Sequence, residues 1–192
     1  MRTEEFKIEE IAKKYNISPI VLNLMEKRGV TSEEKLKHFL NPTDKSFHDP
    51  FLLSGMKELV ERINKAMADN EKVLIFGDYD VDGVSASAIL IKYFAERNFY
   101  VDYFLPNRYV DGYGLTKDSI LRVKDKYNPS LIITVDCGIS CHEEVEFARA
   151  LGIDIVITDH HDIPEIIPNT IVVDPKLDGQ KYPFKYLCGT GV

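Results

Sequence analysis

From Gly55 onward, short apolar runs alternate with amphipathic segments of helical length. The runs have the length of fully buried strands, and the segments between them are long enough to cross over a sheet. Strands are expected at 73–76, 100–105, 131–135, 153–158 and 171–173, with helices at 56–68, 84–97, 116–127 and 141–151. The pattern predicts an α/β fold with a mainly parallel sheet of about five strands flanked by helices.

The first fifty residues have apolar positions at helical spacing instead. Helices are expected at 4–15, from Ser18-Pro19 to Gly29, and from Thr31 to just before Asn41-Pro42. A stretch rich in Pro and Asp follows at 41–50. We therefore expect a helical N-terminal segment at 1–50 and an α/β domain at 51–192.

The composition of the chain indicates its cellular compartment and limits the partners it can bind. Its 192 residues contain no apolar run near the roughly 20 residues of a membrane span, and the charged N-terminus lacks the apolar core of a signal peptide. The three cysteines are odd in number and do not form a disulfide framework. These features predict a cytoplasmic protein. A net charge of −7 is unusual for a chain that wraps nucleic acid by itself, but bound cations would partly neutralise clustered carboxylates.

Acidic or histidine-containing clusters follow three of the expected strands immediately. They are Asp78, Asp80 and Asp82 in the run 77–83, then Asp136, and then the triplet Asp159-His160-His161. In a parallel sheet all three clusters lie at the carboxyl edge, where open α/β folds bind ligands. We therefore expect residues that are distant in sequence to meet in one crevice.

Carboxylates gathered in this way repel one another unless a positive charge lies among them. Carboxylate oxygens together with imidazoles suit manganese, magnesium or zinc. One aspartate that bridges two ions creates a centre able to stabilise the attacking and the leaving oxygen of a phosphoryl displacement. The pattern alone thus predicts a two-metal phosphoesterase.

Other interpretations of single motifs fit less well. The spacing Asp78-x-Asp80-x-Asp82-Gly83 opens like an EF-hand loop, but Ile89 stands where that loop needs a bidentate Glu. The same run is similar to the first motif of haloacid-dehalogenase phosphatases, which have no role for a His-His pair. Cys137 and Cys141 lack a second ligand pair for zinc and are expected to be small buried or half-buried side chains. Asp136 taken alone is equally consistent with a helix cap.

Four ordered motifs resemble the DHH phosphoesterase superfamily and, within it, the RecJ branch. They are Gly77-Asp-Tyr-Asp-Val-Asp-Gly83, Leu105-Pro-Asn-Arg-Tyr-Val-Asp-Gly-Tyr-Gly-Leu115, Val135-Asp-Cys-Gly138 and Thr158-Asp-His-His161. The resemblance implies a 5′-to-3′ exonuclease of single-stranded DNA that acts in recombination and repair. It implies two divalent metal ions as cofactors, with manganese preferred and magnesium as the alternative. It also implies a monomer with a helicase or single-strand-binding protein as partner.

The resemblance also assigns roles to single residues. Asp80 would hold one metal with support from Asp78, and Asp82 would hold the other. Asp136 would bridge the two ions and act in catalysis. His160 would complete the second site. We also include its neighbour in sequence, Asp159, among the metal-binding residues. His161 would be catalytic, in contact with the scissile phosphate.

A phosphate-binding role is expected in the second motif. Arg108 resembles a clamp for the terminal 5′ phosphate, which its planar guanidinium suits. Gly112 and Gly114 would let the backbone turn close to the substrate. The structural alternative for Arg108 is a surface salt bridge.

The chain departs from the family in lacking the later metal-binding aspartate, because Asp174 is too close to the triplet. Its glycine-rich end at 189–192 resembles the middle of a loop-to-helix transition, so we expect a fragment of a catalytic domain. Because the later aspartate is missing, we expect this fragment to bind metal weakly and to have little activity alone. Two other classes stay open: a DHH hydrolase of short oligonucleotides, cyclic dinucleotides or pyrophosphate, and a non-catalytic RecJ-like scaffold. Phe76 stands where the former carry His.

Overall fold

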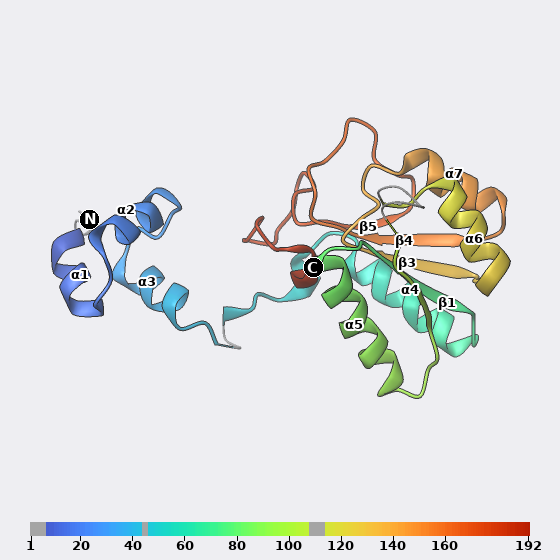
Figure 1. The fold of residues 1–192 in the computed structure, drawn as a ribbon, viewed down its shortest axis with the longest axis horizontal. Coiled ribbons are helices and arrows are strands. Elements are labelled where there is room, and N and C mark those ends of the chain that lie inside the picture. The colour runs from blue at the N-terminus through green and yellow to red at the C-terminus, as the bar shows by residue number, and fades with distance from the viewer. Residues whose placement is uncertain (1–6, 44–45, 108–113) are drawn as a thin grey trace. The chain divides into compact units, whose positions relative to one another are not determined.

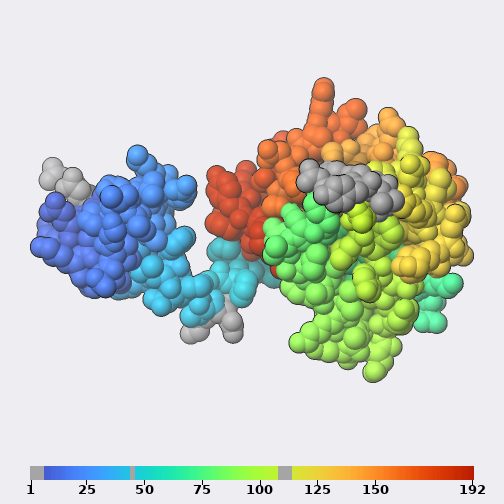
Figure 2. All heavy atoms as spheres, viewed as in Figure 1, coloured from blue at the N-terminus to red at the C-terminus, as the bar shows by residue number. Residues whose placement is uncertain are grey.

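The computed structural model describes residues 7–43, 46–107 and 114–192. The chain divides into two units, Met1–His48 and Asp49–Val192. In the space-filling view the colours run from blue to cyan over the first unit and from cyan to red over the second (Figure 2).

The N-terminal unit consists of α1 (Ile8–Tyr15), α2 (Pro19–Lys27) and α3 (Glu33–Leu40). Its small core contains Leu22 and Leu36, both completely buried. The Ser32 side chain accepts a hydrogen bond from the Lys35 N–H and so caps α3. The helices predicted before the α/β domain are therefore confirmed.

The second unit is built on a five-stranded sheet in which every neighbouring pair of strands is parallel (Figure 1). The strands are β1 (Val73–Gly77), β2 (Asp102–Phe104), β3 (Leu131–Val135), β4 (Asp154–Thr158) and β5 (Ile171–Val173). The helices are η2 (Pro50–Leu52), α4 (Met56–Ala68), α5 (Val81–Ala95), α6 (Lys117–Tyr127), α7 (His142–Ala150) and η3 (Gly189–Gly191). This confirms the predicted α/β fold. None of the helices in the described ranges is long and apolar enough to cross a membrane.

The hydrophobic core lies on both faces of the sheet, because successive strand residues point in opposite directions. Ile75 and its neighbour Ile133 belong to one cluster, which includes residues of α4 and α5. Leu74 and its neighbour Ile132 belong to the other, which includes residues of α6 and α7. All four side chains are at most 1% exposed. Burial on both faces explains why these strands are continuously apolar in sequence.

The strand order is β2-β1-β3-β4-β5. The chain leaves β1 toward β2 on one side and then returns to add β3 on the other side. The carboxyl ends of β1 and β3 therefore flank the topological switch point, the place where open α/β sheets bind ligands.

One boundary in this region differs from its prediction. Helix α5 begins at Val81 rather than at residue 84, because the Asp80 side chain accepts hydrogen bonds from the N–H groups of Asp82 and Gly83 and acts as the N-cap. Asp82 and Gly83 thus belong to the first helical turn, and the acidic motif is a tight strand-to-helix turn.

Arg62 on α4 ties the helix to two other parts of the unit. Its Nε donates to Asp154 Oδ2 at 2.6 Å, and its Nη2 donates to Glu71 Oε2 at 2.8 Å. The Arg62 and Glu71 side chains are only 17% and 18% exposed. Replacing Arg62 would leave a half-buried carboxylate without its cation.

We expect Arg62→Met to lower the free energy of unfolding by about 2 kcal/mol in urea denaturation. The control is Lys57→Met, which removes a largely exposed ion pair with Glu61 and should change stability by less than about 0.5 kcal/mol. Equal effects of the two substitutions would contradict this structural role of Arg62.

Candidate metal centre

An aspartate directly follows each of four neighbouring strands. These residues are Asp78 after β1, Asp136 after β3, Asp159 after β4 and Asp174 after β5. The last residues of the four strands are in register, so the aspartates form one row at the carboxyl edge. Each is at most 1% exposed. The sheet therefore buries four carboxyl groups side by side, which costs free energy unless each finds a donor or a cation.

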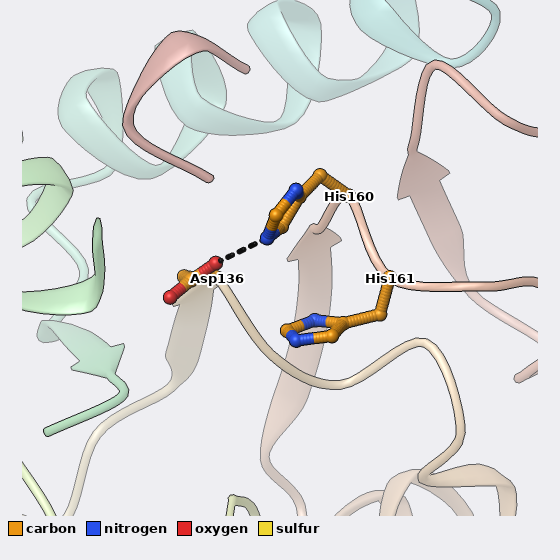
Figure 3. Close-up of side chains that lie close together, drawn as sticks. All are labelled: Asp136, His160 and His161. Carbon is orange, nitrogen blue, oxygen red and sulfur yellow. Dashed lines mark ion pairs between the residues drawn. The ribbon is translucent and has the colours of Figure 1, made fainter. Parts of the chain in front are cut away.

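Two groups of side chains in the described residues are close enough to share a metal ion. One comprises Asp78, Asp80 and Asp136, and the other comprises Asp136, His160 and His161. Within each group the ligand atoms lie within 4.8 Å of one another. Figure 3 shows the second group, with the His160 ring turned toward the Asp136 carboxylate. Asp136 belongs to both groups, as a ligand that bridges two ions would.

Of the four aspartates in the row, Asp136 is the one whose charged form is most strongly disfavoured. Burial, followed by the negative charges of Asp80 and Asp82, raises the pKa of its carboxyl to about 7. Its buried Oδ1 makes no hydrogen bond to any described residue. Its backbone has φ +62°, in the left-handed region that Asp and Asn tolerate better than most residues.

His160 presents Nε2 to this oxygen at 3.1 Å, marked by the dashed line in Figure 3. Its other ring nitrogen, Nδ1, lies 3.1 Å from the backbone oxygen of Leu187. Because a carbonyl oxygen only accepts, Nδ1 donates to Leu187, and Nε2 is the ring nitrogen that faces Asp136. An imidazole nitrogen and a carboxylate oxygen are both common metal-ligand atoms, so these residues suit a bound metal ion.

Asp159 lies outside both ligand groups, and both of its oxygens already accept hydrogen bonds. Oδ1 accepts from His161 Nδ1 at 2.7 Å, and Oδ2 accepts from the Ile139 N–H at 2.9 Å. Burial lowers the pKa of His161, but the hydrogen bond to Asp159 and the nearby carboxylates outweigh it, so the pKa lies above its usual value. The geometry favours Asp159 as the residue that orients His161, and its direct metal binding stays a prediction.

Asp82, expected to hold the second metal, contacts the end of the chain. Its Oδ1 accepts from the Thr190 hydroxyl at 2.8 Å, and its Oδ2 accepts from the Gly189 N–H at 3.2 Å. Burial raises the pKa of Asp82, but these hydrogen bonds outweigh it and hold the pKa below its usual value. Asp82 thus stays ionised and keeps the negative charge that a bound cation would neutralise.

Gly83 allows the strand-to-helix turn that gathers these carboxylates. A Cβ at Gly83 would overlap the backbone nitrogen and oxygen of Asp78. Only a residue without a side chain lets the first turn of α5 pack this closely against the end of β1. The close approach places Asp80 beside Asp78 and Asp136.

Asp174 is a member of the row that sequence reasoning set aside. Its Oδ1 accepts from the Lys176 N–H at 2.7 Å, whereas its buried Oδ2 has no hydrogen-bond partner among the described residues. Burial raises the pKa of its carboxyl to about 6. The sequence signal was available, because Asp174 directly follows the expected strand 171–173.

The predicted phosphate-binding residues are only partly described. Arg108 and Gly112 lie outside the described residues. Gly114 is buried and has φ +66°, a conformation that favours glycine. Its predicted contact with substrate stays a prediction.

Cys137 and Cys141, which follow Asp136 in sequence, have surroundings that indicate a structural role. Cys137 is buried and Cys141 half-buried, as predicted. The Cys141 thiol lies 3.5 Å from the Leu115 backbone oxygen. Neither cysteine belongs to a metal-ligand group of the described residues.

Comparison with known proteins gives concordant matches in sequence. The family model described as "DHH family, N-terminal domain" matches residues 72–192. The single-stranded-DNA-specific exonuclease RecJ of Bacillus subtilis is 39% identical over 192 residues, which cover 100% of this chain and 24% of that protein. RecJ of Escherichia coli is 34% identical over 180 residues, covering 92% of this chain and 30% of that protein.

Solved structures give the same result. A crystal structure of exonuclease RecJ bound to manganese matches with a TM-score of 0.64 and 32% identity, covering 73% of this chain and 35% of that one. RecJ from Thermus thermophilus in complex with Mn²⁺ matches with a TM-score of 0.68 and 25% identity, covering 97% of this chain and 25% of that one. The chain therefore belongs to the DHH family, in its RecJ-like branch.

Proposed function

We propose that this chain supplies the two-metal hydrolytic centre of a 5′-to-3′ exonuclease that acts on single-stranded DNA. The observation that carries the proposal is Asp136, a buried carboxylate shared by two ligand groups at the switch point of the sheet. The printed names of the RecJ relatives support the DNA substrate. The chain spans 24% and 30% of the length of these two relatives, so substrate and polarity are parts of the proposal.

The proposed ligands fall into two sets that share Asp136. Asp78 and Asp80 would hold one ion with it, and His160 and Asp82 would hold the other. Two divalent cations, when bound, would supply a hydroxide near neutral pH and neutralise charge on the phosphate oxygens. Oxygen and imidazole donors suit manganese or magnesium, and the solved relatives bound to manganese support manganese. The raised pKa of Asp136 makes it sensitive to a cation, whose charge would restore the ionised form.

His161 is the proposed contact to the scissile phosphate. Its Nδ1–H is held by Asp159 Oδ1, which fixes the ring plane and leaves Nε2 as the nitrogen for other partners. The raised pKa of His161 favours the imidazolium, which attracts an anionic phosphate. We assign Asp159 the role of orienting this ring.

The 5′ polarity rests on the second motif. Arg108 is proposed to bind the terminal 5′ phosphate through its planar guanidinium, and Gly112 and Gly114 to keep the adjacent backbone close to the strand. Of these residues only Gly114 lies in the described part of the chain.

The direct test is a nuclease assay with manganese and 5′-phosphorylated single strands. It uses the 192-residue chain and a chimera in which the chain replaces the matching part of the Bacillus subtilis relative. We expect the chimera to release a 5′ label first as mononucleotide and to shorten 3′-labelled strands progressively. Asp136→Asn should reduce the rate at least about 100-fold, because it removes the shared ligand charge.

The matched control for this assay is Lys57→Met, a surface change far in sequence from the centre, which should retain the rate of the unmodified chimera. Release of the 3′ label first would refute the polarity. Full activity of the Asp136→Asn chimera would refute the two-metal mechanism.

A second prediction concerns stability without metal. The Asp136 carboxyl titrates near pH 4 when unfolded and near pH 7 when folded, so the folded state binds this proton more tightly. Its favourable contribution is complete below pH 4 and is lost as pH rises through 7. We therefore compare the free energy of unfolding of Asp136→Asn with that of the unmodified chain in EDTA. The variant's value minus that of the unmodified chain should increase by about 2–4 kcal/mol when the pH rises from 4.5 to 8. Urea denaturation at the two pH values measures this gain.

The control for the stability test is Asp125→Asn on α6, where the side chain is exposed. The difference in free energy of unfolding between Asp125→Asn and the unmodified chain should change by less than about 0.5 kcal/mol between the two pH values. An Asp136→Asn effect that is the same at both pH values would mean that Asp136 bears no buried charge at pH 8.

A further inference from the structure

We propose that Leu187–Thr190, named here the positioning segment, holds Asp82, Asp136 and His160 in the arrangement that binds metal. We further propose that Gly189 is required because only its hydrogen fits beside Asp136. The inference rests on the proposed two-metal site and adds to it residues that act through its ligands.

The segment fixes Asp82 through both of its carboxylate oxygens. A hydroxyl has one proton, and the Thr190 hydroxyl is closest to Asp82 Oδ1, at 2.8 Å. The Gly189 N–H donates to Oδ2 at 3.2 Å, and the Thr190 N–H lies 3.4 Å from Oδ1. Donors on both oxygens hold the carboxylate plane in one orientation and support its negative charge.

The same segment sets the proton position on His160. The Leu187 carbonyl accepts from Nδ1 at 3.1 Å and thereby selects the tautomer whose Nε2 has a lone pair. That Nε2 lies 3.1 Å from Asp136 Oδ1. A metal-bound imidazole commonly depends on such an outer contact for its orientation and basicity.

Gly189 places the backbone directly against the shared ligand. It is buried, and a Cβ added to it would overlap the Asp136 carboxylate. A side chain there would displace either the carboxylate or the segment. Because the segment also holds Asp82 and His160, a shift would disturb three proposed ligands together.

Three ligands that follow three different strands thus meet one short segment. Asp82 follows β1, Asp136 follows β3 and His160 follows β4. Helix η3, which contains Gly189 and Thr190, packs against α5, and Figure 1 shows it, in dark red, near the start of that helix. The contact with α5 gives the segment a fixed support, so its donors can orient the ligands before a metal ion arrives.

The test measures Mn²⁺ affinity of the 192-residue chain by the electron paramagnetic resonance signal of free Mn²⁺. The matched pair is Gly189→Ala and Gly191→Ala, the same change two residues apart. A Cβ at Gly191 would lie 3.4 Å from Leu187 Cδ2 and 3.7 Å from Cys188 Sγ, in ordinary contact. We expect Gly189→Ala to weaken Mn²⁺ binding about 10- to 100-fold and Gly191→Ala to change it less than about twofold.

A second pair keeps the test decisive if Gly189→Ala fails to fold. Thr190→Val removes the hydroxyl at nearly constant volume and should weaken Mn²⁺ binding about tenfold, whereas Thr190→Ser retains the hydroxyl and should restore binding. Urea denaturation in EDTA separates this loss from a general loss of stability.

The possible outcomes separate the two proposals. If the unmodified chain binds Mn²⁺ and both the Gly189→Ala and Thr190→Val variants bind it equally well, the positioning role is wrong and the metal site stands. If Thr190→Ser binds as poorly as Thr190→Val, the hydroxyl is not the cause and the role is again wrong. If neither the unmodified chain nor its chimera with the Bacillus subtilis relative binds Mn²⁺, the proposed function is overturned together with this inference.

Discussion

The repulsion among buried carboxylates at one edge of the sheet is the constraint on which the rest of the structure depends. Asp136 is almost completely buried, and Asp80 and Asp82 add negative charge around it, so its pKa rises to about 7. In such surroundings a carboxylate requires a proton or a cation. The unpartnered Oδ1 of Asp136 and the Nε2 of His160 that faces it are the direct structural expression of this requirement.

The fold brings these carboxylates together and also supplies donors that offset part of their repulsion. Parallel strands in register bring their terminal aspartates into one row, and the strand order places β1 next to β3 at the switch point. The donors available nearby satisfy the flanking members of the row only in part. The N–H of Ile139 and the ring of His161 satisfy Asp159, and the N–H of Lys176 satisfies one oxygen of Asp174. Asp136 and Asp174 each have one buried oxygen without a hydrogen-bond partner among the described residues, but it is Asp136 that both ligand groups share.

Much of this arrangement could be predicted from the sequence, because buried strands and helix caps are local patterns. The alternation of apolar runs predicted the parallel sheet, and the positions of Asp78, Asp136 and Asp159 after their strands predicted the common edge. The strand order could not be predicted in this way, since it depends on packing between distant segments. Helix α5 begins three residues before its predicted start because Asp80 is a helix cap as well as a candidate ligand.

The contacts of Asp82 and Asp159 lay beyond sequence reasoning for a similar reason. Both were expected to bind metal as members of acidic motifs, yet each already accepts hydrogen bonds on both oxygens. The donors of Asp82 are more than a hundred positions away in the chain, and no local pattern links them. Asp174 shows the opposite case, because it directly follows a predicted strand, which is the same local signal that marks the other three aspartates of the row.

The central claim is that Asp136 joins two cation sites, and the most direct measurement is the anomalous scattering of Mn²⁺ in crystals of the chain. The account predicts two adjacent peaks that share Asp136 as a ligand, one next to Asp80 and the other next to His160 Nε2. Peaks confined to other carboxylates, or no peak within bonding distance of Asp136 at saturating Mn²⁺, would contradict it.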